Sequence, residues 1–135
     1  MASRQKWARS RDEGYRHRYD QVTRNRSEAK TEQYKFYKSK AWAGLRAQVL
    51  ARDDHIDQYL KLLGIYEVAD TVDHIVPIEF EPDQMQNPDN LISCGRHTHL
   101  IKTRWEKKYY FDRGGQPKSV EPIREIGKIL PILAP

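Results

Sequence analysis

Four polar side chains that could act together are spread over a short part of the sequence. Asp73 and His74 are consecutive, Asn90 follows a proline-containing turn, and His99 follows a glycine. A carboxylate and an imidazole can bind one divalent cation, and an imidazole with a pKa of about 6.5 can accept a proton near neutral pH. Singly, each residue has an ordinary role in a surface hydrogen bond or a turn. Together they predict metal-assisted or acid–base chemistry.

Two short strands are predicted to carry the first three of these residues. Residues 71–75 are rich in β-branched side chains and are followed by Pro77, and residues 91–94 form a second apolar run that ends at Gly95. We predict that the two runs pair. Because neighbouring side chains of a strand point to opposite faces, Asp73 and His74 need a local twist or bulge to serve one site.

Helices are predicted on both sides of the strands. Residues 33–53 have apolar side chains at three- and four-residue spacing, with Ser39 as a potential cap, and should pack over the unit that holds the site. Residues 54–64 predict a turn and a short helix closed by Gly64. A longer helix should begin near Arg96 or His97, carry His99, and end at about Tyr110.

The C-terminal segment has a helical pattern of its own. Ile123, Ile126, Ile129 and Leu130 recur at roughly helical spacing before Pro131. Either this is a short helix that docks on the rest of the chain, or it is an exposed apolar stripe that meets another protein. We divide the chain into a basic arm that is mobile or partly helical (1–31), one domain (32–113) and this tail (114–135).

Composition points to an anionic partner. The chain has 135 residues, a net charge of +5 and 38% hydrophobic residues, and its pI is about 9.3. Nucleic acid is the first candidate, and a basic surface with no partner is the alternative. The single cysteine excludes an internal disulfide and an all-cysteine zinc site. With no apolar run of membrane-spanning length and no signal region, we expect a cytoplasmic protein that does not contact a membrane.

The order strand, loop, strand, helix, with Asp-His on the first strand, Asn in the loop and His at the helix start, resembles the ββα-metal unit of the HNH endonuclease family, and of its small phage-encoded members in particular. The match covers about half of the chain and includes Phe36-Tyr37-Lys38-Ser39-Lys40-Ala41-Trp42, Asp73-His74-Ile75-Val76-Pro77, Asn90-Leu91 and His99 with Lys102-Thr103. The resemblance implies an α+β fold: a two-stranded antiparallel hairpin plus a helix, with added N-terminal helices.

The resemblance also implies a role for each residue. His74 would be the general base, Asp73 and His99 would hold one divalent cation, most simply Mg²⁺ or Mn²⁺, and Asn90 would brace the loop that fixes His74. Thr103 stands where some relatives have a further ligand, which would leave the cation more weakly held. The last helix lies in the DNA minor groove in this family, so its basic residues would contact phosphates: Arg96, Lys102, Arg104, Lys107 and Lys108.

One departure concerns a structural zinc. Many relatives hold it with two Cys-x-x-Cys pairs, and the corresponding places here are 57–60 and 95–98, which contain no cysteine. We expect no structural zinc, with apolar contacts from Tyr59, Leu60, Leu62 and Leu63 in its place. An irregular zinc site made by Cys94, His97 and His55 is a rival that fits no standard spacing.

The sequence therefore predicts a metal-dependent HNH endonuclease that nicks or cuts double-stranded DNA with little sequence preference. The phage resemblance implies work beside a terminase in genome packaging, in the host cytoplasm. Two alternatives remain: a non-catalytic DNA-binding module on the same fold, and a docking subunit of a packaging motor that acts through the arm and the tail.

Overall fold

The computed structural model describes residues 30–133. Nearly all of the predicted basic arm, residues 1–29, lies outside the described residues. The chain divides after Lys40 into two compact units. In the first, residues 30–37 are helical, and the hydroxyl of Ser39 donates a hydrogen bond of 2.6 Å to the carbonyl of Phe36.

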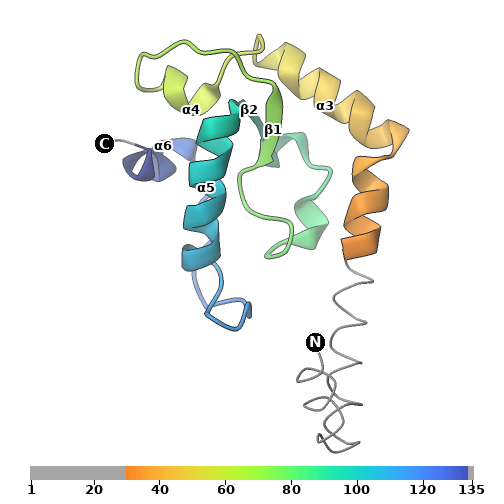
Figure 1. Cartoon of the computed structure of the whole chain (residues 1–135), viewed down its shortest axis with the longest axis vertical. Coiled ribbons are helices and arrows are strands. Elements are labelled where there is room, and N and C mark those ends of the chain that lie inside the picture. Colours follow the sequence, from red (N-terminus) through yellow and green to blue (C-terminus); the bar gives the residue numbers. More distant parts are fainter. Residues whose placement is uncertain (1–29, 134–135) are drawn as a thin grey trace, which may run out of the picture. The chain divides into compact units, whose positions relative to one another are not determined.

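The second unit is built on a two-stranded antiparallel hairpin (Figure 1). Strand β1, Thr71–His74, pairs with strand β2, Leu91–Cys94, so that Asp73 lies opposite Ile92 and His74 opposite Leu91. Both strands fall where the β-branched and apolar runs predicted them. The connection between them contains two short 3-10 helices, Pro82–Gln84 and Pro88–Asn90.

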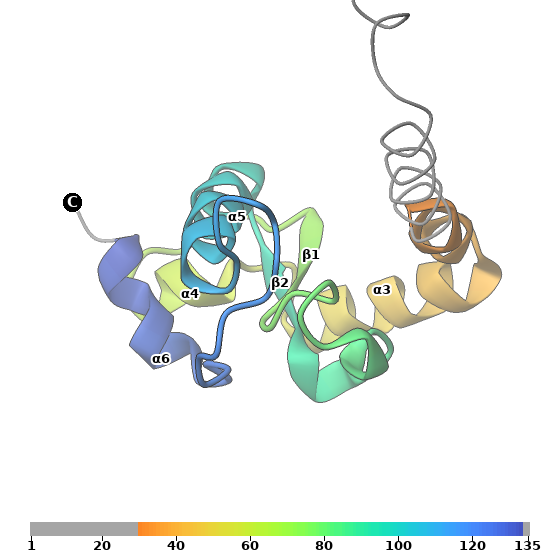
Figure 2. The same cartoon turned by 90° about the horizontal axis from the view of Figure 1, so that it is seen from below.

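Helices cover both faces of the hairpin (Figures 1 and 2). Helix α3, Lys40–Arg52, lies on one face, where its Trp42 ring stacks on the His74 imidazole. Helix α5, Arg96–Tyr109, lies on the other. The prediction that the upstream helix packs over the site is confirmed for α3. The single helix predicted over 33–53 is interrupted at Lys38 and Ser39.

Two short helices complete the face that α5 covers. Helix α4, Gln58–Lys61, begins after Asp57 and is followed by Gly64, which has a φ of +79° that favours glycine. Helix α6, Ile126–Ile129, runs into a 3-10 turn, Leu130–Ile132. Ile129 is fully buried in the core with Tyr59, Ile75, Ile92 and Cys94, so the tail packs on the chain's own core.

The architecture is α+β, a ββα unit with added helices. Its core lies between the hairpin and α4, α5 and α6, and Trp42 of α3 packs on the other face of the hairpin. Within residues 30–133, no helix has the length and apolar character needed to cross a membrane.

Candidate functional site

Asp73 and His99 come together between β1 and the start of α5. The Nε2 atom of His99 lies 3.5 Å from Oδ1 of Asp73, and the Asp73 side chain is 4% exposed whereas that of His99 is 41% exposed. Two atoms bound to one Mg²⁺ or Mn²⁺ at about 2.1 Å can be at most about 4.2 Å apart, so both atoms can bind one such cation. Among residues 30–133, no three His, Cys, Asp or Glu side chains gather, so this pair would leave positions for water and substrate.

The second oxygen of Asp73 is held by the protein. Oδ2 lies 2.9 Å from the ammonium of Lys102 and accepts a hydrogen bond of 3.0 Å from the hydroxyl of Tyr59. Burial, and then the charge of Asp73, raise the pKa of Tyr59 well above its ordinary value, so its hydroxyl stays a donor. Only Oδ1 of this carboxylate faces His99.

Lys102 is a correction to the sequence prediction. It was expected on the DNA-facing surface, but its side chain is fully buried and pairs with Asp73 and Glu106. Burial lowers the pKa of its ammonium, yet the two carboxylates raise that pKa more, and the net pKa is above its ordinary value. A buried ammonium with these partners cannot reach a phosphate on the outer face of the helix.

His74 is enclosed on the opposite face of the hairpin. Its ring stacks on Trp42 with centroids 5.8 Å apart, and its Nε2 lies 3.0 Å from the carbonyl oxygen of Met85. A carbonyl only accepts, so Nε2 carries the proton in that contact and Nδ1 is the basic nitrogen. Burial lowers the pKa of His74, and the Met85 carbonyl and Asp73 raise it only in part. The imidazole is therefore neutral at neutral pH.

Asp73 and His74 leave the strand on different sides. The pairing of β1 with β2 runs without a bulge from Thr71 to His74, so the twist or bulge expected for this pair is not present within the four pairs. Asp73 contacts α4 and α5, and His74 contacts α3 and the loop before β2. His74 is the last residue of β1 and pairs with Leu91, so the two residues lie at the end of the hairpin that the connecting loop closes.

Asn90 fastens the loop between the strands. Its side-chain oxygen accepts a hydrogen bond of 2.9 Å from the backbone N–H of Val76, and its amide donates one of 3.0 Å to the carbonyl of Val76. The same amide lies 3.5 Å from the carbonyl of Gln84, beside Met85. Asn90 is 4% exposed, and its side chain holds the loop that contains the Met85 carbonyl beside His74.

The remaining basic residues of α5 are accessible. Arg96, Arg104, Lys107 and Lys108 are all exposed, in contrast to Lys102. Lys107 also lines a cavity of about 520 Å³ together with Glu79, Thr103 and Glu106. The four exposed cations leave one helix face able to meet a phosphate backbone.

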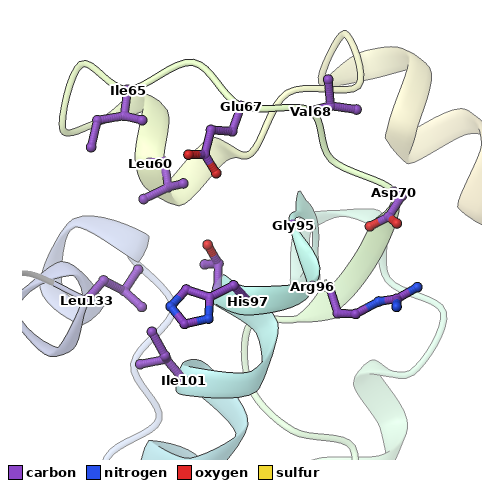
Figure 3. A pocket seen from close by; sticks show the side chains of 11 residues that line it. Leu60, Ile65, Glu67, Val68, Asp70, Gly95, Arg96, His97, Ile101 and Leu133 are labelled. Carbon is purple, nitrogen blue, oxygen red and sulfur yellow. The ribbon is translucent and has the colours of Figure 1, made fainter.

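A second cavity, of about 460 Å³, lies between the segment 60–70 and the start of α5 (Figure 3). Leu60 and Ile65 come from one side and Ile101 and Leu133 from the other, and Glu67 and His97 lie between them. None of Asp73, His74 and His99 lines it. It is therefore separate from the pair that could bind a cation.

Asp57 links the segments 57–60 and 95–98, which are the segments predicted above to correspond to the structural zinc site of other family members. Its fully buried carboxylate accepts hydrogen bonds of 3.0 Å from the N–H of Leu60 and 2.9 Å from the N–H of Gly95. Tyr59 is buried as expected, but Leu62 and Leu63 are 54% and 41% exposed. The expected apolar replacement is thus wrong for these two leucines, and hydrogen bonds of one carboxylate link the two segments.

The rival zinc site is also not formed. Cys94 is fully buried, and burial raises the pKa of its thiol far above the ordinary value, whereas His55 and His97 are exposed. No three potential ligands gather anywhere in the described part of the chain.

Sequence reasoning missed three residues that contact the site. Trp42 was assigned to a helix core only, Tyr59 to apolar packing, and Lys102 to DNA. The four-residue spacing of Lys102 and Glu106 was an available signal, since such pairs interact along one helix face. For Trp42 and Tyr59 the sequence carries no comparable signal.

Comparison with known proteins agrees with this geometry. No protein-family model and no curated protein matches the chain. Among solved structures, the crystal structure of the HNH endonuclease of the deep-sea thermophilic bacteriophage GVE2, with manganese ion, matches with a TM-score of 0.59 and 30% sequence identity, covering 74% of this chain and 99% of that one. Because the match spans nearly all of that protein at this identity, this chain belongs to the HNH endonuclease family.

Proposed function

We propose that this chain is a divalent-metal-dependent endonuclease that hydrolyses phosphodiester bonds of double-stranded DNA, by nicking or cutting. The observation that carries the proposal is the 3.5 Å approach of Asp73 Oδ1 and His99 Nε2, with the buried, neutral His74 following Asp73 as the last residue of β1. A carboxylate and an imidazole at this separation fit one hard divalent cation, and the manganese ion in the similar phage enzyme supports Mg²⁺ or Mn²⁺.

The side chains divide the work. His74 would accept the proton of the attacking water at Nδ1, since Nε2 donates to the Met85 carbonyl. Asp73 and His99 would hold the cation, which when bound stabilises the negative charge that builds up on the phosphate and on the leaving 3′ oxygen. Asn90 would keep the imidazole oriented through the loop. Arg96, Arg104, Lys107 and Lys108 would contact phosphates without reading sequence.

The test is plasmid nicking with Mg²⁺, Mn²⁺ or EDTA. We expect nicking that needs the metal and that falls by at least about 10²-fold in His74→Ala, because the general base is lost. His97→Ala, which removes an exposed histidine of the same helix as His99, is the matched control and should keep full activity. Nicking that survives EDTA, or full activity of His74→Ala, would contradict the proposal.

Measurements of metal affinity should distinguish the proposed roles of His74 and His99. By calorimetry, His74→Ala should bind Mn²⁺ as the native chain does, whereas His99→Ala should bind it about 10-fold or more weakly, because one of two protein ligands is gone. Equal affinity in both variants would overturn the roles assigned to them. DNA binding without nicking under every metal would favour the non-catalytic module instead.

The phage source of the similar enzyme supports a wider setting. We extend the proposal to a phage-encoded protein that works beside a terminase during genome packaging in the host cytoplasm, where the terminase supplies the choice of site. Co-purification of this chain with the terminase subunits of the same genome tests that setting. Failure to associate would remove the packaging role and leave the nuclease proposal untouched.

A further inference from the structure

The two oxygens of Asp73 have unlike surroundings, and that difference is built by residues outside the metal pair. Oδ2 receives the Lys102 ammonium at 2.9 Å and the Tyr59 hydroxyl at 3.0 Å. Oδ1 faces His99 Nε2 at 3.5 Å. Since the donors come from α5 and α4, two elements converge on one oxygen of a side chain that is itself 4% exposed.

Lys102 is fixed in place by three acceptors. Besides Asp73, its ammonium contacts a carboxylate oxygen of Glu106 and donates to the backbone carbonyl of His74 at 2.8 Å. An ammonium has three N–H groups, so each can have one acceptor. The side chain is fully buried and cannot extend to solvent as lysines usually do.

These contacts connect α5 to both consecutive site residues. Lys102 holds the side chain of Asp73 and the backbone of His74, and His99 lies one helical turn earlier on the same helix. The contacts of Lys102 with β1 therefore hold α5 where His99 lies 3.5 Å from Asp73. A shift of α5 along the strand would move the two proposed ligands apart.

We propose that Lys102, with Tyr59, is a positioning residue that reserves Oδ2 of Asp73 for the protein and leaves Oδ1 as the one oxygen for the cation. The inference rests on the proposed function, because it assigns a partner to the proposed metal ligand. Asp73 then binds the ion through one oxygen only, and the ion keeps more of its positions for water and phosphate. The carboxylate is also held in its binding orientation before the ion arrives.

A crystal soaked with Mn²⁺ tests the geometry directly. The expected result is an ion bound by His99 and by Oδ1 of Asp73, with Oδ2 still within hydrogen-bond distance of Lys102 and Tyr59. An ion bound by both oxygens of Asp73, with Lys102 displaced, overturns this inference and leaves the nuclease proposal standing. No ion at Asp73 and His99 overturns the proposed function itself.

Variants test the same idea in solution. In Tyr59→Phe, one neutral donor is lost and Asp73 is freer, so the Mn²⁺ dissociation constant from calorimetry should rise about 10-fold. In Lys102→Met, a positive charge beside the ligand is lost, so the dissociation constant should stay equal or fall while kcat at saturating Mn²⁺ falls at least about 10-fold. Lys61→Met removes an exposed lysine of α4 and is the matched control, expected to change neither quantity.

The readout separates positioning from support of the fold. A purely structural role would lower the fraction of folded protein but leave the dissociation constant and kcat per folded molecule unchanged, and that result overturns the inference. Lys102→Met leaves two buried carboxylates without their ammonium and can fail to fold. In that event Tyr59→Phe, which removes only one hydrogen bond, decides the question through its Mn²⁺ affinity.

Discussion

The surroundings of His74 change the pKa of its imidazole. The Trp42 ring and the loop carbonyl of Met85 enclose it, and this burial lowers the pKa of the imidazole. A lowered pKa keeps the base unprotonated at the cost of some basicity. The sign for stability follows from the same shift: neutral His74 stabilises the fold fully above the unfolded pKa of about 6.5, and this stabilisation is lost as pH falls through the lower folded pKa.

The pH dependence of nicking should show this shift. We expect the rate to fall to half only below about pH 6.5, because burial lowers the pKa at which His74 loses its basic form. Trp42→Leu should let water reach the imidazole and move this acidic limb to higher pH. Single-turnover nicking between about pH 5 and 8 measures both. Trp105→Leu removes a tryptophan that stacks on Tyr109 instead, and a limb that moved equally in both variants would refute the role of Trp42.

At the residue scale, the sequence indicated candidate site residues but not the side chains that surround them. Asp73, His74, Asn90 and His99 were selected because their types and spacing resemble the HNH family, and the structure brings Asp73 and His99 to 3.5 Å from each other. Lys102 was misplaced because it stands among other cations on a helix. Helical spacing puts Glu106 beside it, but only tertiary packing brings Asp73 to the same ammonium. Tyr59 was taken for an apolar contact because its hydroxyl partner lies on another element.

At the scale of elements, the Asn90 side chain joins the two ends of the loop between the strands. The Asn90 side chain satisfies both the N–H and the carbonyl of Val76, a residue that is fully buried. Its backbone carbonyl also accepts a hydrogen bond of 2.8 Å from Ile75, which continues the ladder past β1. The end of β1 and the loop therefore move together.

Asn90→Ala should release the loop between the strands from the end of β1. Two buried backbone groups would lose their partners, so we expect the free energy of unfolding to fall by roughly 2–4 kcal/mol and nicking by the remaining folded protein to fall as well. Urea unfolding and plasmid nicking measure the two effects. Gln86→Ala changes an exposed amide of the same loop and should do neither. If Asn90→Ala unfolded like the native chain, the loop would not depend on this side chain.

Most element boundaries could be predicted from the sequence, but the break at Lys38 and Ser39 could not. The strands ended where Pro77 and Gly95 follow β-branched or apolar runs, and Gly64 marked the end after α4. The break at Lys38 and Ser39 was missed because helical spacing continues across it. There the Ser39 hydroxyl donates to a carbonyl of the preceding turn, a local interaction that competes with a continuous helix.

At the scale of the whole molecule, the chain has an excess of positive charge, and one exposed helix face carries several of these charges. The chain carries a net charge of +5, and Arg96, Arg104, Lys107 and Lys108 are exposed on α5. Affinity for duplex DNA should therefore fall steeply with salt, because each phosphate that the protein neutralises releases counterions.

Charge removal should change that salt dependence. In Lys107→Gln/Lys108→Gln, we expect weaker binding to duplexes of any sequence, and a slope of log affinity against log salt that is smaller by about 0.9 for each phosphate that the variant no longer neutralises. Fluorescence anisotropy over a salt series measures the slope. Lys61→Gln/Lys128→Gln removes two exposed cations from other helices. If this control changed the slope equally, binding would depend on total charge and not on the face of α5.

For the C-terminal tail, the sequence predicted a helix but not the surface on which it packs. The spacing of Ile126 and Ile129 predicted a helix but left its partner open, since an apolar stripe looks alike whether it meets its own domain or another protein. The core among Tyr59, Ile92 and Cys94 accepts Ile129, and that space exists only once the hairpin and α4 are assembled.

Asp57 makes a connection within the fold that does not require a metal ion. One carboxylate holds the start of α4 and the start of α5 together, a task that many relatives give to a bound zinc. Under the proposed function, the cation at Asp73 and His99 therefore has no part in joining α4 to α5. We expect the chain to stay folded when a strong chelator removes that cation, and to accept a different divalent ion afterwards.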